Sequence, residues 1–253
     1  MGKNRIWYGL AGIFAMLSLT ATTVSAQEKS YINGIDANFP PFAYVDKTGK
    51  PAGFDVDAID WIAEKLGFKV KHQPMDWDGI IPNLNAKKID FIASGMSITP
   101  EREKVVNFSI PYYDIKQVFV AKKDSGLTVN DILTKKMKLG VQRGTTEAEW
   151  LKTEAEKQGW NFTLTYYDSA PLAVEDVVNG RIAAAAMDDA PAEDAVTKKP
   201  VAILGTFGMK EEKFGIAVRK EDKELLETIN KGLTLLMADP YWKVLQEKHL
   251  SKK

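Results

Sequence analysis

Arg102 is the first candidate functional residue in this sequence, because a cation is unfavourable at its position in the predicted helix. Segment 90–102 begins as an apolar run typical of a buried strand and then becomes small and polar. It enters a helix with Thr99 as N-cap and Pro100 at the first helical position. Arg102 falls in the first turn, where a cation opposes the helix dipole. Since arginine can bind a carboxylate through two parallel hydrogen bonds, Arg102 is either a solvated surface residue or a carboxylate-binding group.

Further polar or small residues stand where other predicted strands end. In open parallel sheets, ligands bind beyond the carboxyl ends of the strands. Each of these residues could instead cap a helix or form a turn, but their shared position favours one common site. The residues at the strand ends are Asp36, Ser94, Gly95, Met96, Ser97, Gln142, Thr145, Thr146 and Asp188.

The functional groups at these positions complement one another. The guanidinium of Arg102, the hydroxyl groups of Ser97 and Thr146, and the N–H groups of the helix that begins beside Thr146 suit an α-carboxylate. Asp188 offers an acceptor for an ammonium group. A set that holds both a carboxylate and an ammonium group indicates an amino-acid site.

Two aromatic residues, Phe39 and Trp77, lie near the ends of the first and second predicted strands. Their rings could enclose an aliphatic or cationic side chain of the ligand. We therefore include both in the predicted site.

The elements that must position these residues alternate between strand and helix patterns. This order predicts an α/β fold with mostly parallel sheets flanked by helices. The pattern restarts near Val118, so we expect two lobes joined by two crossings of the chain. Strands are predicted near 31–36, 68–72, 90–93, 118–121, 137–141, 161–166, 182–187 and 214–218, and helices near 53–66, 80–88, 129–133, 147–158, 171–179, 225–236 and 241–248.

Composition excludes several other classes of protein. Lys+Arg and Asp+Glu both number 34, so no net charge points to nucleic acid or to an anionic membrane. The chain has no cysteine, which removes disulfides, thiol nucleophiles, thiolate metal sites and a lipoprotein anchor. Its two histidines, His72 and His249, offer little for a metal cluster or a catalytic triad. We expect neither a metal nor a cofactor.

The N-terminal residues have the pattern of a cleavable signal peptide. Lys3 and Arg5 precede an apolar run over 6–19, and residues 24–26 supply small residues at the cleavage positions. The alternative, a membrane anchor, needs about 20 apolar residues, and this run is shorter. We expect cleavage after Ala26 and a periplasmic protein.

Seven segments together resemble the family-3 extracellular solute-binding proteins, the polar amino-acid binding proteins of ABC importers. Any one segment is weakly specific, but all seven occur in order over nearly the whole chain. They are 36–42 (DANFPPF), 53–57 (GFDVD), 75–82 (MDWDGIIP), 94–102 (SGMSITPER), 108–113 (FSIPYY), 144–146 (GTT) and 187–188 (MD).

The resemblance implies a two-lobed periplasmic-binding-protein fold of type II. Lobe 1 would comprise 27–114 and 208–253 and lobe 2 would comprise 115–207, with crossings near 113–118 and 204–213. The two lobes would close over one L-amino acid, which a membrane permease complex would then receive. The resemblance further implies a monomer that is not an enzyme.

The same resemblance assigns roles to individual residues. Arg102 would bind the ligand carboxylate with help from Ser97 and Thr146. Asp188 would bind the α-ammonium together with the main-chain carbonyl of Gly95. The rings of Phe39 and Trp77 would stack on the ligand side chain.

The identity of the ligand rests on fewer residues. Members of the family for basic amino acids and for glutamine both carry an acid at the position of Asp36. Gln142 stands where the glutamine binders have a lysine, and Glu147 follows Thr146, so we favour arginine or lysine, with glutamine next. The alternative function is an enzyme on the same fold that resembles periplasmic cyclohexadienyl dehydratases, with Glu147 as a possible proton donor.

Overall fold

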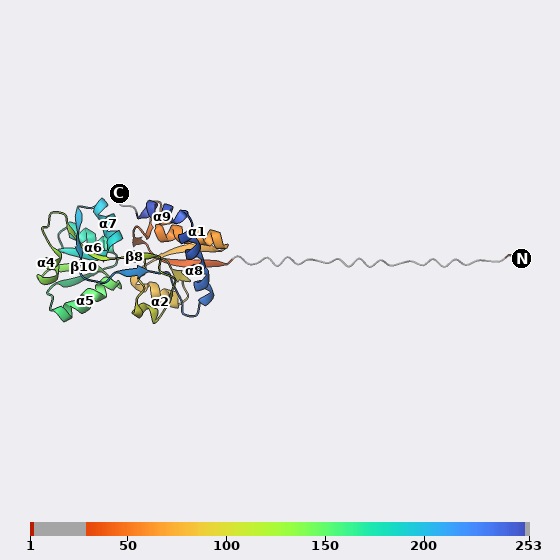
Figure 1. The fold of residues 1–253 in the computed structure, drawn as a ribbon, viewed down its shortest axis with the longest axis horizontal. Coiled ribbons are helices and arrows are strands. Elements are labelled where there is room, and N and C mark those ends of the chain that lie inside the picture. The colour runs from red at the N-terminus through yellow and green to blue at the C-terminus, as the bar shows by residue number, and fades with distance from the viewer. Residues whose placement is uncertain (3–28, 251–253) are drawn as a thin grey trace.

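The computed structural model describes residues 1–2 and 29–250. Apart from its first two residues, the predicted signal peptide lies outside the described residues. The described chain forms two α/β lobes, one containing β10 and helices α4 to α7 and the other containing α1, α2, α8 and α9 (Figure 1). The expected two-lobed α/β fold is confirmed.

Lobe 1 is built on a five-stranded sheet in the order β5-β1-β6-β15-β7. Strand β1 pairs in parallel with β5 and β6, whereas β15 pairs antiparallel with β6 and β7. The bounds are β1 Ser30–Asp36, β5 Lys69–Met75, β6 Phe91–Ile92, β7 Asn107–Phe108 and β15 Ala217–Val218.

Lobe 2 repeats this arrangement in the order β11-β10-β12-β9-β13. Strand β10 pairs in parallel with β11 and β12, whereas β9 pairs antiparallel with β12 and β13. The bounds are β9 Gln117–Lys122, β10 Lys138–Gln142, β11 Thr163–Tyr167, β12 Ala184–Asp188 and β13 Val201–Thr206.

Each sheet is thus more mixed than the mostly parallel sheet that we expected. The parallel pairs come from the strand–helix–strand repeats, in which a helical crossover returns the chain in the same direction. The antiparallel strands are those next to the crossings, where the chain enters the sheet from the other lobe. Strand direction there depends on the path between the lobes and not on local sequence.

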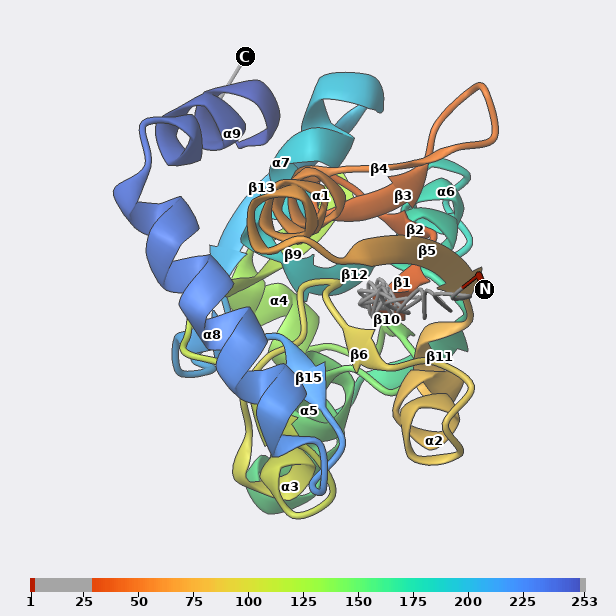
Figure 2. The same ribbon diagram turned by 90° about the vertical axis from the view of Figure 1, so that its right-hand side faces the viewer.

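Helices cover both faces of both sheets, as the apolar periodicity predicts. In lobe 1, α1, α8 and α9 pack against one face and α2 against the other (Figure 2). In lobe 2, α6 and α7 cover one face and α4 and α5 the other. The bounds are α1 Phe54–Leu66, α2 Ile80–Asn85, α3 Pro100–Glu103, α4 Val129–Thr134, α5 Thr146–Gln158, α6 Ala170–Val178, α7 Asp189–Lys198, α8 Lys223–Ala238 and α9 Tyr241–His249. Among the described residues, none of the helices combines the length and apolar character needed to span a membrane.

A two-stranded ribbon joins the lobes. Strand β8 (Tyr113–Ile115) follows β7 of lobe 1, and strand β14 (Glu212–Phe214) follows β13 of lobe 2. The two strands pair antiparallel, with Glu212 opposite Ile115, and β8 lies between the lobes in Figure 1. The chain therefore passes between the lobes twice along one hydrogen-bonded ribbon.

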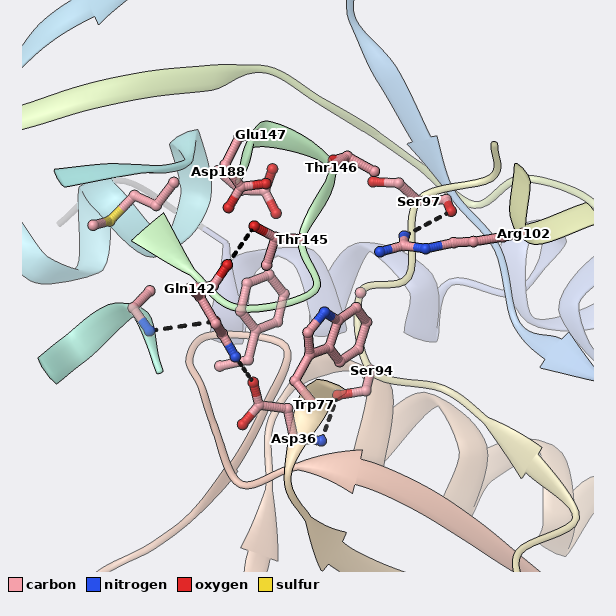
Figure 3. Close-up of a pocket in the computed structure, with 14 residues that line it drawn as sticks. Asp36, Trp77, Ser94, Ser97, Arg102, Gln142, Thr145, Thr146, Glu147 and Asp188 are labelled. Atoms are coloured by element: carbon pink, nitrogen blue, oxygen red, sulfur yellow. Dashed lines mark hydrogen bonds between the residues drawn. The ribbon is translucent and has the colours of Figure 1, made fainter. Parts of the chain in front are cut away.

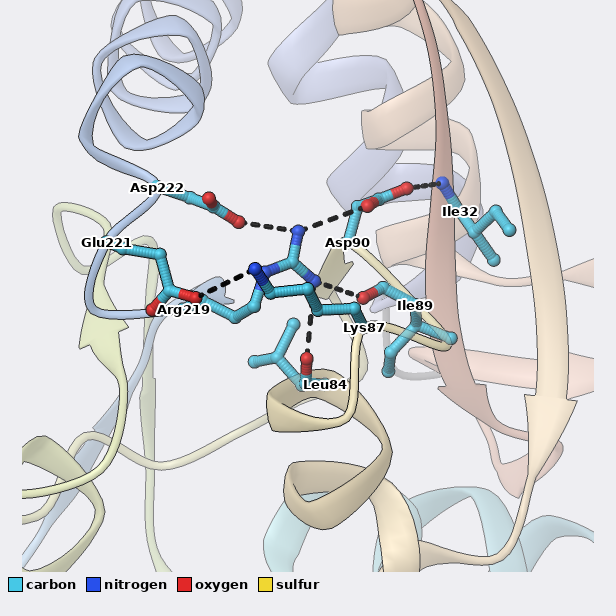
Figure 4. Close-up of polar contacts among 8 residues, drawn as sticks. All are labelled: Ile32, Leu84, Lys87, Ile89, Asp90, Arg219, Glu221 and Asp222. Carbon is cyan, nitrogen blue, oxygen red and sulfur yellow. Dashed lines mark hydrogen bonds and ion pairs between the residues drawn. The ribbon is translucent and has the colours of Figure 1, made fainter.

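A buried arginine fixes the segment that leads to the predicted site. The guanidinium of Arg219, which follows β15, donates to the carbonyl oxygens of Leu84 and Ile89 and pairs with the carboxylates of Asp90 and Asp222 (Figure 4). Asp90 also accepts from the N–H of Ile32 in β1 at 2.8 Å. These bonds hold the start of β6 against β1 and β15, so the residues after β6 leave the sheet at a fixed place.

Candidate ligand-binding site

A cavity between the lobes gathers the predicted site residues. Its walls come from the ends of β1, β6, β10 and β12 and from the starts of α3 and α5 (Figure 3). Every predicted site residue except Met96 lines it. The lining residues are Asp36, Phe39, Trp77, Ser94, Gly95, Ser97, Arg102, Gln142, Thr145, Thr146, Glu147, Ala170, Met187 and Asp188.

Arg102 reaches the cavity from the short helix α3. The hydroxyl of Thr99 caps this helix by accepting from the Arg102 N–H at 3.2 Å, as the sequence predicts. The guanidinium donates to the carbonyl oxygens of Ser97 at 3.0 Å and Gly144 at 3.2 Å, and its central carbon lies 5.5 Å from the centre of the Trp77 ring. The bond to Gly144 joins lobe 1 to lobe 2, so Arg102 lies where both lobes meet.

The segment before α3 is held by its own backbone and by a buried acid. Gly95 has φ +59° and donates its N–H to the Asp55 carboxylate at 2.7 Å. A Cβ on Gly95 would lie 2.3 Å from the Phe39 ring, so only glycine fits here. Ser94 accepts from the Asp36 N–H at 2.9 Å, whereas Met96 is fully buried in the core that includes α2. Met96 therefore contributes packing under the cavity and not a part of its wall.

The two aromatic residues line the cavity from lobe 1. Phe39, in the small sheet formed by β2 (Asn38–Phe39), β3 (Ala43–Val45) and β4 (Pro51–Ala52), stacks on Phe42 at 5.6 Å between ring centres. The indole N–H of Trp77 donates to the carbonyl oxygen of Gly144 at 3.2 Å. Trp77, like Arg102, thus contacts the other lobe directly.

Asp36 and Gln142 face each other across the cleft. The Gln142 amide donates to one Asp36 carboxylate oxygen at 2.7 Å, and the other oxygen accepts from the Asn38 N–H at 2.9 Å. Asp36 is 3% exposed. Burial raises the pKa of Asp36 above its ordinary value, although the hydrogen bond from Gln142 acts in the opposite direction.

The start of α5 brings two hydroxyls and an acid to the lobe 2 wall. The Thr145 hydroxyl donates to the Gln142 carbonyl at 2.9 Å, and the Thr146 hydroxyl donates to the Glu212 carboxylate at 2.8 Å. Glu147 is buried. Burial is the main cause that raises the pKa of Glu147 to about 7, and the nearby charge of Glu212 adds to it.

Asp188 ends β12 and is buried at the same wall. It accepts from the Gln117 amide at 2.9 Å. Burial, and then the charge of Glu147, raise the pKa of Asp188 well above its ordinary value. A cation placed beside Asp188 would stabilise its ionised form.

Sequence reasoning missed several residues at or behind these walls. Glu147, Ala170 and Met187 line the cavity but are not among the predicted site residues. Glu212 and Gln117 lie behind Thr146 and Asp188. The position of Glu147 beside Thr146 was a usable signal, whereas Glu212 lies far away in sequence and offered none.

The donor and acceptor groups fit an organic zwitterion better than a metal ion. Within residues 1–2 and 29–250, no group of three or more histidine, cysteine, aspartate or glutamate side chains is arranged to hold a metal. Arg102 supplies positive charge at one part of the cavity, and Asp188, Glu147 and Asp36 supply acidic groups elsewhere. This arrangement can hold a carboxylate together with one or more cationic groups.

The chain is similar to known solute-binding proteins over most of its length. A model of the bacterial extracellular solute-binding proteins, family 3, matches residues 31–252. The chain is 35% identical to an L-arginine-binding protein of Pseudomonas aeruginosa, over 96% of this chain and 95% of that protein.

Two solved structures are similar over nearly the same part of the chain. One is an ancestral arginine-binding protein bound to arginine, 40% identical with a TM-score of 0.80, covering 88% of this chain and 99% of that one. The other is an ancestral amino acid-binding protein described as a precursor of cyclohexadienyl dehydratase. It is 35% identical with a TM-score of 0.81, and the match covers 88% of this chain and 96% of that one.

Proposed function

Because the chain belongs to the bacterial extracellular solute-binding proteins of family 3, we propose that it is the periplasmic binding protein of an amino-acid ABC importer. Its two lobes close over one polar L-amino acid, with arginine or lysine preferred and glutamine next. The observation that carries this proposal is that Arg102 of lobe 1 and Asp188 of lobe 2 line one cavity. A zwitterion that contacts both lobes favours the closed state, which the permease complex recognises.

The ligand carboxylate binds the guanidinium of Arg102. The guanidinium has five N–H groups and donates to the carbonyl oxygens of Ser97 and Gly144, so N–H groups remain for the ligand carboxylate. Ser97 and the N-terminus of α5 at Thr146 supply further donors. The α-ammonium binds Asp188 and the main-chain carbonyl of Gly95.

The ligand side chain lies between Phe39 and Trp77 and points toward Asp36. A cationic side chain is preferred because the cavity walls contain the acids Asp36, Glu147 and Asp188 and the single cation Arg102 among the described lining residues. A ligand with a positively charged side chain offsets more of this charge than a neutral one.

The location and partners of the protein follow from the same proposal. A signal peptide over 1–26 directs the chain to the periplasm, where it acts as a monomer and meets an inner-membrane permease complex. The lobe boundaries expected from the sequence lie near residues 114 and 208. The ribbon supports them, because β8 (Tyr113–Ile115) includes the first and β14 (Glu212–Phe214) follows the second.

The dehydratase alternative would use Glu147 as a proton donor, and its pKa of about 7 would suit that task. However, the similar ancestral protein that is described as a precursor of such an enzyme is itself named an amino acid-binding protein. We therefore propose binding without a reaction.

Isothermal titration calorimetry with the twenty amino acids, beside a prephenate turnover assay, tests these functions. We expect saturable binding of L-arginine or L-lysine and no turnover. Arg102→Ala and Asp188→Ala should each abolish binding while thermal unfolding stays cooperative. Turnover of prephenate without amino-acid binding would overturn the proposal, as would unchanged affinity in either variant.

A further inference from the structure

Gln117 is a polar side chain in a strand where apolar residues are expected. It begins β9, whose next four residues are buried and apolar, and Gln117 itself is 1% exposed. A buried amide costs free energy unless its hydrogen bonds are made. A side chain that breaks the local pattern in this way is a candidate for a functional role.

The amide nitrogen of Gln117 donates to two carboxylates. The nitrogen lies 2.9 Å from an Asp188 oxygen and 3.3 Å from a Glu212 oxygen. Gln117 and Asp188 are direct partners in the antiparallel pairing of β9 with β12. The backbone register therefore places this amide against the Asp188 carboxylate.

The amide is held in this orientation at a cost. The carbonyl oxygen of Gln117 is buried and has no hydrogen-bond partner among the described residues. Turning the amide over would bring that oxygen against the carboxylates of Asp188 and Glu212, which repel it. The two acids therefore determine which way the amide points.

Glu212 connects this amide to the rest of the site. It lies on the ribbon strand β14, and the same carboxylate oxygen that faces Gln117 accepts from the Thr146 hydroxyl at 2.8 Å. Gln117 is thus the link between Asp188 at one part of the wall and the ribbon that joins the lobes. Neither Gln117 nor Glu212 lines the cavity.

From this geometry we propose that Gln117 is a positioning residue for amine recognition: its amide holds the Asp188 carboxylate where the ligand α-ammonium binds. The inference rests on the proposed function of amino-acid binding. The hydrogen bond from Gln117 also favours the ionised form of Asp188 and so opposes the effect of burial on its pKa. Without this bond, Asp188 would be free to turn away or to take up a proton, and the ammonium would lose its partner.

The test replaces Gln117 by methionine, which has the same length and no donor. Calorimetry would compare two probes in the unaltered protein and in Gln117→Met: L-arginine, and L-argininic acid, which carries a hydroxyl in place of the α-ammonium. We expect the variant to bind L-arginine at least about tenfold more weakly, the usual size for a hydrogen bond to a charged group. Affinity for L-argininic acid, which has no ammonium to present to Asp188, should change less than about threefold.

The same exchange at Gln73, a half-buried residue of β5 in the other lobe, is the matched control and should leave both affinities unchanged. If Gln117→Met fails to fold, Gln117→Asn withdraws the amide by one methylene group and should give the same discrimination between the probes.

Each remaining outcome counts against the inference. An equal loss of affinity for both probes would indicate a general structural role for Gln117. Unchanged affinity for L-arginine would refute the positioning role. Failure of the unaltered protein to bind L-arginine, L-lysine or any other amino acid would instead overturn the proposed function, and the inference with it.

Discussion

Asp36→Asn is the sharpest test of ligand preference, because it removes one charge and keeps the shape of the side chain. Asp36 is 3% exposed and its two oxygens accept from Gln142 at 2.7 Å and from the Asn38 N–H at 2.9 Å. An asparagine oxygen can keep one of these bonds. The loss of negative charge at this part of the cavity is therefore the main effect of the exchange.

The magnitude follows from Coulomb's law. A ligand cation about 4 Å from the carboxylate gains about 4 kcal/mol at an effective dielectric constant of about 20. Part of this gain is offset because the carboxylate must ionise in a buried place, where its pKa is raised. A net loss of about 2 kcal/mol, or roughly 30-fold in Kd, is expected for a cationic ligand.

The assay is calorimetric titration at pH 7.5 with L-arginine and with L-citrulline, which has nearly the same shape and no side-chain charge. The Kd for L-arginine should rise roughly 30-fold, whereas that for L-citrulline should change less than about threefold. Asp78→Asn is the control, since Asp78 is half exposed and does not line the cavity. Equal losses for the two ligands would refute the assignment of Asp36 to a cationic side chain.

Three further predictions concern the scaffold around the site. Arg219→Met should lower the free energy of unfolding by about 1–3 kcal/mol in urea titrations, because it leaves the carbonyl oxygens of buried Leu84 and Ile89, and the half-buried Asp90 carboxylate, without their donor. Gly95→Ala should weaken L-arginine binding at least about tenfold and lower stability by about 1–3 kcal/mol, since the new Cβ would displace the Phe39 ring. Glu147→Gln should stabilise the ligand-free protein at pH 8 and have less effect at pH 5. The pKa of Glu147 in the folded protein, about 7, lies above its value in the unfolded chain. Ionised Glu147 therefore destabilises the folded protein increasingly as the pH rises from the unfolded pKa to the folded pKa.

Control variants separate the specific effects of Arg219→Met and Gly95→Ala from the effects of any exchange at a similar position. Lys220→Met removes an exposed cation next to Arg219 and should change stability by less than about 0.5 kcal/mol. Gly126→Ala places a Cβ at nearly the same φ as Gly95, +66°, with no atom within 4 Å, so it should show the backbone cost without the loss of binding. A pH-independent effect of Glu147→Gln would contradict the assigned titration.

Local sequence was sufficient for most of the helices and for the strand-end residues, although α7 (Asp189–Lys198) is not among the expected helices. The N-cap at Thr99 with Pro100 after it, and the end of α1 at Gly67 with φ +71°, follow from interactions within one turn of the chain. Asp36 and Asp188 could be placed at strand ends because an apolar run of strand length needs only a few residues to recognise.

The direction of strands β9 and β15 and the burial of Met96 became evident only in the tertiary structure. Strands β9 and β15 pair antiparallel because the chain reaches them from the ribbon between the lobes, a path that no local pattern reports. Met96 stands among polar site residues in sequence, but its side chain points into the core of lobe 1.

The sequence by itself placed an arginine, an acid and an aromatic pair at or near strand ends, and from these groups we predict an amino-acid site. Only the tertiary structure decided which groups meet: Gln142 with Asp36, Thr146 with Glu212, and Gln117 with Asp188. Each of these pairs joins segments that are more than 60 residues apart. Side-chain type and spacing report the chemistry that is available, whereas the approach of two distant segments depends on how the lobes and the ribbon pack.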